Sequence, residues 1–347
     1  LKRLELHHNQ LNELPDELGH LSALETLILE ANNRLVLPTV LSRLTKLKSL
    51  KINHCSLKVL IPELFQLHHL QELYVLNNQL TRFDVAAGQL PHLRFLSLEQ
   101  NHFVTFPKGI TNLKNLEGLY FSSNRFTRLP DELGQLVHLK ELGLSHNPLT
   151  ALPQTIGQLQ KLKVLDIDHG KLKRLPPEIG QLKHLQTLDA SHNQLEEIPL
   201  ELGQLSELDE LDLSNNQLTT LPTQIGQLKA LTVLNLSGNR LTKLPPEIGQ
   251  MKGLRVLILS GNQLTELPDE LGQLTQLESL KLEENQLSNL PLSLRRHSID
   301  RSIFVDVFDN PISLKVKREL EVFLSNVYLN YDTTEGDLEW LLAGEFA

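Results

Sequence analysis

A leucine recurs every 23 residues along almost the whole chain, and this period constrains the fold more than any other feature. These leucines stand at positions 1, 24, 47, 70, 93, 116, 139, 162, 185, 208, 231, 254 and 277. Thirteen units of 23 residues therefore cover residues 1–299 without an insertion, and a partial fourteenth unit follows in residues 300–312 after a two-residue slip. Self-similarity at a fixed period of this length indicates a solenoid of stacked repeats.

Each unit follows the order L-x-x-L-x-L-x-x-N-x-L-x-x-L-P-x-x-I/L-G-x-L-x-x, as in residues 208–230. The first part alternates with period two, which predicts a short strand with one buried face, and successive strands must then run parallel. Position 9 is Asn in most units, and its amide is expected to satisfy backbone groups of the turning chain. Leucines at positions 11, 14, 18 and 21 are expected to fill the interior. Proline at position 15 is expected to start a short helical or extended segment, and glycine at position 19 to permit a tight turn.

This unit resembles that of leucine-rich repeat proteins of the 23-residue class that carries L-P-x-x-I/L-G-x-L. The class is similar to Ras-associated scaffolds of the Scribble and Ras-suppressor kind and to large bacterial repeat families, and the resemblance covers residues 1 to about 312. It implies an α/β repeat fold: a right-handed curved horseshoe with a parallel β-sheet on its concave face and short helical or extended segments on its convex face. It implies binding as the activity, with a small GTPase or a kinase as one candidate partner.

A few units depart from the pattern, and the ends of the chain raise separate expectations. Local loop geometry is in doubt where Arg34, Ile61, Asp84 and Gly170 replace the usual residue, and Cys55 takes the place of the Asn. Residues 313–347 are expected to form a helical cap and tail, with one apolar stripe formed by Leu314, Leu320, Phe323, Leu324 and Val327. The segment around Trp340 is interpreted as a second cap helix or as a linker, and the tail is expected to cover Phe304 and Phe308. A cap, further repeats or another domain is expected before Leu1.

Composition narrows the classes of partner. The formal net charge of -9 disfavours nucleic acid and favours basic proteins or cations. A single cysteine excludes an intramolecular disulfide and favours a reducing, cytoplasmic compartment, although a secreted or surface location stays open if a leader has been removed. No apolar run approaches the length of a membrane span.

Acidic residues gather on the strand side in units 7 to 10. Positions 3, 5, 7, 8 and 10 are expected to face outwards there, and over the fourteen units they hold fourteen acids and six bases, so most of the net negative charge lies on this side. Repulsion between neighbouring carboxylates should raise their pKa values. A docking surface for a Lys/Arg-rich protein segment and a solvated acidic face without ligand are the two interpretations. We call the following residues the acidic patch: Glu141, Asp166, Asp168, His169, Asp189, His192, Glu210 and Asp212.

Aromatic residues mark the strand side of units 4 to 6. The aromatic patch consists of Tyr74, Leu76, Phe95 and Tyr120, which are typical of protein contact sites unless neighbouring side chains cover them. Other phenylalanines occupy interior positions and are expected in the core: Phe83, Phe103, Phe106, Phe121 and Phe126.

Catalysis and metal binding are both disfavoured. Aspartate and histidine columns offer metal ligands, but a column on a gently curved sheet is not expected to converge on one point, and no metal or phosphate motif accompanies it. An open trough also lacks the closed pocket that a carboxylate pair needs for catalysis. The sequence thus predicts a scaffold without enzyme activity, metal or cofactor, which binds a protein on its concave face. The alternative is a secreted or surface-exposed bacterial recognition protein that binds a host protein or glycan.

Overall fold

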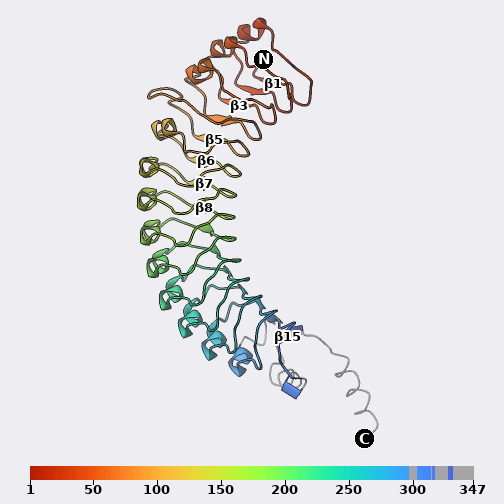
Figure 1. Ribbon diagram of the computed structural model, residues 1–347, viewed down its shortest axis with the longest axis vertical. Helices are drawn as coiled ribbons and strands as arrows, with labels where there is room; N and C mark the ends of the chain where they lie inside the picture. Colours follow the sequence, from red (N-terminus) through yellow and green to blue (C-terminus); the bar gives the residue numbers. More distant parts are fainter. Residues whose placement is uncertain (297–302, 314, 317–326, 331–347) are drawn as a thin grey trace, which may run out of the picture. The chain divides into compact units, whose positions relative to one another are not determined.

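The computed structural model describes residues 1–296, 303–313, 315–316 and 327–330. The chain forms two compact units, residues 1–185 and 186–347. Within each unit the repeats stack side by side, and in the first unit the short helices form a column on the side away from the strands (Figure 1).

Three-residue strands centred on position 4 form the sheet of the first unit. Neighbouring strands are parallel and pair with an offset of one 23-residue repeat, as in Leu4 opposite Leu27. The strands are β1 (Arg3–Glu5), β2 (Thr26–Ile28), β3 (Ser49–Lys51), β4 (Glu72–Tyr74), β5 (Phe95–Ser97), β6 (Gly118–Tyr120), β7 (Glu141–Gly143) and β8 (Val164–Asp166).

The second unit continues the same pattern up to its last strands. Its strands are β9 (Thr187–Asp189), β10 (Glu210–Asp212), β11 (Val233–Asn235), β12 (Val256–Ile258), β13 (Ser279–Lys281), β14 (Ile303–Asp306) and β15 (Val327–Asn330). Leu280 pairs with Val305, which is an offset of 25 and reflects the two-residue slip seen in the sequence.

Single 3-10 turns complete most repeats, and the proline at position 15 usually precedes them in an extended conformation, as at Pro153. In the first unit they are η1 (Asp16–His20), η2 (Thr39–Arg43), η3 (Pro62–Gln66), η4 (Lys108–Asn112), η5 (Asp131–Gln135), η6 (Gln154–Gln158) and η7 (Pro177–Gln181). In the second unit they are η8 (Leu200–Gln204), η9 (Thr223–Gln227), η10 (Pro246–Gln250), η11 (Asp269–Gln273) and η12 (Leu292–Arg296). Ile61 replaces the proline without loss of the helix, whereas no 3-10 helix forms between β4 and β5, where Asp84 replaces it.

Leucines and phenylalanines fill the interior as the period predicts. Phe83, Phe103, Phe121 and Phe126 are among the largest fully buried side chains, and Phe106 is buried beside Phe121 at a ring distance of 5.6 Å. The asparagines at position 9 tie consecutive repeats together. Asn124, for example, donates from Nδ2 to the carbonyl oxygens of Leu98 and Phe121, and its Oδ1 accepts from the Phe103 backbone amide. The expected role of this position is confirmed.

The glycine at position 19 has a different role from the expected one. Gly134 has no left-handed backbone, so a tight turn does not require it. A Cβ atom there would lie 2.6 Å from the carbonyl oxygen of Thr155, in the helix of the next repeat. Glycine is therefore needed because neighbouring 3-10 turns approach each other closely.

Two expectations about the C-terminal region need correction. Val327 belongs to strand β15, which pairs in parallel with β14, and not to a helical stripe. Phe304 and Phe308 are 41% and 50% exposed, so they are not covered as expected. Residues 315–316 of the expected cap are helical, and its residues 314, 317–326 and 331–347, including Trp340, lie outside the described residues.

Candidate functional site

The residue at position 8 has a left-handed backbone in all fourteen repeats. Its φ lies between 50° and 65°, from His8 in the first repeat to Asp309 in the last. Because Asn, Asp, His and Gly tolerate this region best, the backbone accounts for the histidines at this position without any ligand. His169 and His192 therefore have a local structural reason that the sequence pattern did not reveal.

The aromatic patch lies on the strand side of the first unit, which we call the strand face. Each of its three rings stands opposite a small residue on the following strand: Tyr74 opposite Ser97, Phe95 opposite Gly118, and Tyr120 opposite Gly143. A Cβ atom on Gly118 would lie 2.7 Å from Phe95 Cδ1 and 3.0 Å from the Tyr120 hydroxyl oxygen. Phe95 and Tyr120 thus converge over Gly118, where the missing side chain leaves room for both rings.

These rings are half-buried, because neighbouring side chains cover them only in part. Tyr74, Leu76, Phe95 and Tyr120 all keep exposed surface, although they also pack on their neighbours. Lys51 Nζ lies 5.0 Å from the centre of the Tyr74 ring, which is within the range of a cation-π contact. Burial raises the pKa of Tyr74, and burial together with a hydrogen bond raises the pKa of Tyr120.

The aromatic and acidic patches meet at a single hydrogen bond. The Tyr120 hydroxyl donates to the Glu141 carboxylate. This bond fixes the Tyr120 ring in place and leaves the rest of the half-buried Glu141 side chain on the strand face. The strand face of the first unit is therefore aromatic at β4 to β6 and acidic at β7 and β8, and the Tyr120–Glu141 bond joins the two parts.

The first-unit part of the acidic patch is tightly clustered. Burial raises the pKa of Asp166, and repulsion by Asp168 contributes less. The expected shift is therefore present at Asp166, but its main cause is burial. One carboxylate oxygen of each aspartate is buried without a hydrogen-bond partner among the described residues. His169 Nδ1 lies 2.7 Å from Asp168 Oδ2, and the rings of His146 and His169 stack with centres 4.1 Å apart.

A metal ion would find three candidate ligands here. Atoms of His146, Asp168 and His169 that could bind an ion all lie within 4.8 Å of one another. The columns thus converge more closely than expected from the sequence. Asp168 already engages His169, however, and the absence of a metal remains a prediction.

In the second unit the aspartates of the acidic patch have backbone partners. The Ser191 amide donates to Asp189 Oδ1 at 2.9 Å, and the Ser214 amide donates to Asp212 Oδ1 at 2.8 Å. Asp189 stands opposite Asp212 on the neighbouring strand. Glu210 and His192 are exposed, and His192 Nε2 lies 3.1 Å from Asn215 Nδ2. Position 5 aspartates therefore support the strand ends as well as contributing negative charge.

The chain compensates locally for the missing asparagine at Gly170. In other repeats the amide at position 11 donates to the asparagine of the following repeat, as Phe126 does to Asn147 Oδ1 at 3.1 Å. The equivalent amide before Gly170 belongs to Leu149, and it donates instead to the Asn147 carbonyl oxygen at 2.7 Å. The Leu149 amide therefore keeps a hydrogen-bond partner although Gly170 has no side chain to provide one.

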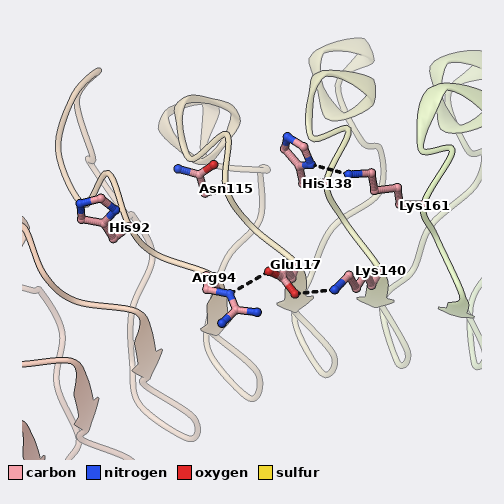
Figure 2. A pocket seen from close by; sticks show the side chains of 7 residues that line it. All are labelled: His92, Arg94, Asn115, Glu117, His138, Lys140 and Lys161. Atoms are coloured by element: carbon pink, nitrogen blue, oxygen red, sulfur yellow. Dashed lines mark hydrogen bonds and ion pairs between the residues drawn. The ribbon is translucent and has the colours of Figure 1, made fainter.

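A basic pocket that sequence reasoning missed lies where strands β5 to β8 begin. It has a volume of about 280 Å³ and is lined by His92, Arg94, Asn115, Glu117, His138, Lys140 and Lys161. Figure 2 shows the His138 and Lys161 pair on one side of it and the row of Arg94, Glu117 and Lys140 on the other. All seven residues occupy positions 23 and 2 of their repeats. Aligning the repeats and comparing the residues at these two positions would therefore have revealed the pocket from the sequence.

Glu117 is the centre of the ion pairs in this pocket. Arg94 Nε lies 2.7 Å from one of its carboxylate oxygens, and Lys140 Nζ lies 2.8 Å from the other. Hydrogen bonds from these two cations lower the pKa of Glu117 to about 2. Lys161 Nζ lies 3.0 Å from His138 Nδ1, and no acid pairs with Lys161 within the part of the chain that the structure describes.

Family models match most of the chain. Models described as leucine-rich repeat region match residues 131–216 and 201–295, and models described as leucine rich repeat match residues 1–21, 45–103 and 104–149. A search of curated proteins gave no match. Within the described residues, no helix is long and apolar enough to cross a lipid bilayer.

Solved structures resemble the chain over nearly its full length. A leucine-rich repeat protein of Leptospira interrogans is 40% identical, with a TM-score of 0.89, and the match covers 95% of this chain and 84% of that one. A plant peptide hormone receptor, RGFR1, in complex with RGF2 is 26% identical, with a TM-score of 0.74; the match covers 92% of this chain and 56% of the receptor. An internalin of Listeria monocytogenes is 21% identical, with a TM-score of 0.78 and coverage of 93% and 90%, and this shows a shared fold alone.

Proposed function

The chain belongs to the leucine-rich repeat family, and we propose that it is a non-catalytic scaffold that binds a protein partner on its strand face. The contact would centre on the aromatic patch and extend over the first-unit residues of the acidic patch, Glu141, Asp166, Asp168 and His169. The second-unit residues of that patch, Asp189, His192, Glu210 and Asp212, would provide further negative charge for a partner on the strand side of their own unit.

The arrangement of Phe95 and Tyr120 over Gly118 is the observation that carries this proposal. Two large rings share the space left by one missing side chain, and both remain half exposed. Rings that are already held in place lose little conformational freedom on binding, and aromatic anchors of this kind contribute most of the affinity at many interfaces.

The acidic patch supports a partner with a basic segment. Asp166 combines a half-buried carboxylate, a raised pKa and one oxygen without a partner among the described residues. Such a group costs stability in the free protein, and a lysine or arginine of the partner that approaches the exposed part of the half-buried Asp166 side chain would offset its negative charge. We infer that this cost is retained because the group contributes to binding.

The comparisons support a protein partner in general terms. The plant receptor is described in complex with RGF2, and such complexes show that this architecture accommodates peptide ligands. The small GTPase or kinase suggested by the sequence resemblance has no counterpart among the partners named for the three structures above, so the proposal does not include it.

A surface or secreted bacterial recognition protein is the second candidate. The relative from Leptospira interrogans, at 40% identity, favours a bacterial setting. The strand face would act in the same way, and only the source of the partner would differ.

Affinity capture with a matched control tests the proposal. The triple variant Tyr74→Ala, Phe95→Ala, Tyr120→Ala removes the rings, while Val104→Ala with Val137→Ala removes exposed apolar side chains elsewhere in the same unit. A protein captured from the source organism by the unchanged chain should bind the triple variant at least ~30-fold more weakly, as expected for loss of hot-spot residues. It should bind the valine variant unchanged. Equal affinity of the triple variant and the unchanged chain would refute the proposal.

A further inference from the structure

Cationic side chains follow the edge of the first unit at which its strands begin. We define the basic edge as positions 22, 23 and 2 of the repeats from residue 46 to residue 184. These positions hold eight Lys or Arg, five His and a single acid, Glu117, which gives a formal charge of +7 with the histidines neutral. Lys48, Arg94, Lys114, Lys140, Lys161 and Lys163 are all exposed. The chain as a whole carries -9, so charge is strongly segregated between this edge and the strand face.

The fold does not require this positive charge. At the same positions of the second unit, from residue 206 to residue 278, Lys229, Lys252 and Arg255 are balanced by Glu207, Asp209 and Glu278. The pairing geometry is similar in both units, because Arg255 bonds Glu278 across one repeat as Arg94 bonds Glu117. Identical repeat geometry therefore exists with a neutral edge, and the excess charge of the first unit calls for a functional reason.

The pocket described above lies within this edge. The single acid is already shared between Arg94 and Lys140, so an incoming anion would not meet a free carboxylate. Lys161 and the Asn115 amide face the same space of about 280 Å³ (Figure 2). The pocket thus offers hydrogen-bond donors and net positive charge to one anionic group, and the neighbouring repeats offer further cations along the edge.

We propose that the basic edge binds a sulfated polysaccharide. Every repeat boundary of the basic edge except the one at residues 68–71 contributes at least one Lys or Arg. These boundaries recur about every 4.8 Å, the spacing of adjacent strands, so the edge suits an extended chain that carries sulfate groups along its length. Duplex DNA is disfavoured because the chain as a whole carries -9, which opposes the dense phosphate backbone of one charge per ~1.7 Å. Single-stranded nucleic acid usually requires aromatic stacking platforms, and the basic edge contains no Phe, Tyr or Trp. This surface adjoins the strand face at Arg94, whose guanidinium carbon lies 5.8 Å from the centre of the Phe95 ring, but the proposed glycan contacts do not require the proposed protein partner.

Binding of the full chain to immobilised heparin and chondroitin sulfate tests the inference. The edge variant Arg94→Ala, Lys114→Ala, Lys161→Ala is compared with the control variant Arg255→Ala, Lys229→Ala, Lys252→Ala, which removes three cations from the same edge of the second unit. At low salt the unchanged chain should bind at least one of the two glycans, with affinity that falls as salt rises. The edge variant should bind about tenfold or more weakly, and the control variant within about twofold of the unchanged chain.

Several outcomes would overturn the inference. These are no binding to either glycan at low salt, equal loss in the two triple variants, or binding of single-stranded or duplex DNA as tight as that of the glycans. Circular dichroism establishes that each variant is folded. If the edge variant does not fold, the single charge reversal Lys161→Glu replaces it, and unchanged glycan affinity of that variant would equally contradict the inference.

Discussion

Replacing Gly170 with asparagine should stabilise the first unit. Asn147, one repeat earlier, shows the bonds to expect: Nδ2 donates to the Phe121 and Leu144 carbonyl oxygens at 3.0 and 2.9 Å. In the register of the repeats, the side-chain amide introduced by Gly170→Asn would reach the Leu144 and Ile167 carbonyl oxygens. The backbone of Gly170 is not left-handed, so the substitution causes no strain there.

The magnitude follows from three contributions. Loss of glycine freedom in the unfolded chain stabilises by roughly 0.4–1 kcal/mol. Two further hydrogen bonds contribute about 0.5–1 kcal/mol each, at the low end because Leu144 already accepts one bond. Ordering the new side chain costs about 0.5–1 kcal/mol. Leu149 adds little, because its amide already has a partner. The net gain for Gly170→Asn is about 1–2 kcal/mol.

Urea unfolding of three proteins separates these contributions. Gly170→Ala contains only the backbone effect and should gain about 0.5 kcal/mol. Gly170→Asn should exceed it by about 0.5–1.5 kcal/mol at an unchanged dependence on urea concentration. If the asparagine variant is no more stable than the alanine variant, the asparagine at position 9 does not contribute through its hydrogen bonds, and the reasoning is refuted.

Three further predictions concern single residues. The pKa of Glu117 is lowered to about 2 from an ordinary value near 4.5, so Glu117 contributes stability that is present above pH 4.5 and is lost as the pH falls towards 2. Glu117→Gln should therefore flatten the dependence of the melting temperature on pH between 4.5 and 2, while Glu132→Gln, at an exposed position, should not. Asp166→Asn should raise the unfolding free energy at pH 7, because burial raises the pKa of Asp166 and so disfavours its charged form in the folded chain. The gain should vanish below pH 3.8, where the carboxyl group is protonated in both the folded and the unfolded chain, and a gain that persists there would contradict this cause. Gly118→Ala should displace Phe95 and Tyr120 and weaken partner binding about fivefold or more, at a cost of about 1–3 kcal/mol in unfolding free energy because the new methyl group overlaps Phe95 Cδ1. Unchanged affinity of the folded variant would count against the shared position of the rings.

The repeat period predicted the parts of the fold that depend on burial. Leu4 and its equivalents form the strand centres, and the phenylalanines assigned to the core are buried, because alternation and period determine which side chains face inwards. Asn124 and its equivalents bond the backbone as expected. Proline at position 15 correctly predicted the start of the short helical segments. Where another residue replaces it, the helix is kept after Ile61 and lost after Asp84, and the residue types alone did not distinguish these two cases.

Features that depend on the sign of the backbone angle φ, or on contacts with neighbouring repeats, were not predicted. The left-handed backbone at His169 has no signature in hydrophobic patterning, so its column suggested a ligand site. The role of Gly134 depends on the distance to Thr155 in the next repeat. The packing of Tyr120 over Gly118 requires knowledge of which residues face each other across strands, and the basic pocket arises only when positions 23 and 2 are combined.

The asparagine bonds make the chain tolerant of changes in repeat number. Between complete repeats the bridging asparagines join residues 21 or 26 positions away, as Asn239 does with Leu218 and Leu213. After the two-residue slip, Asn310 makes the same bonds to residues 23 and 28 positions away. An internal deletion or duplication of 23 residues within the array brings equivalent groups together again, wherever in the repeat the junction falls. Recombination between equivalent positions can therefore lengthen or shorten the surface available to a ligand without redesigning any contact between repeats.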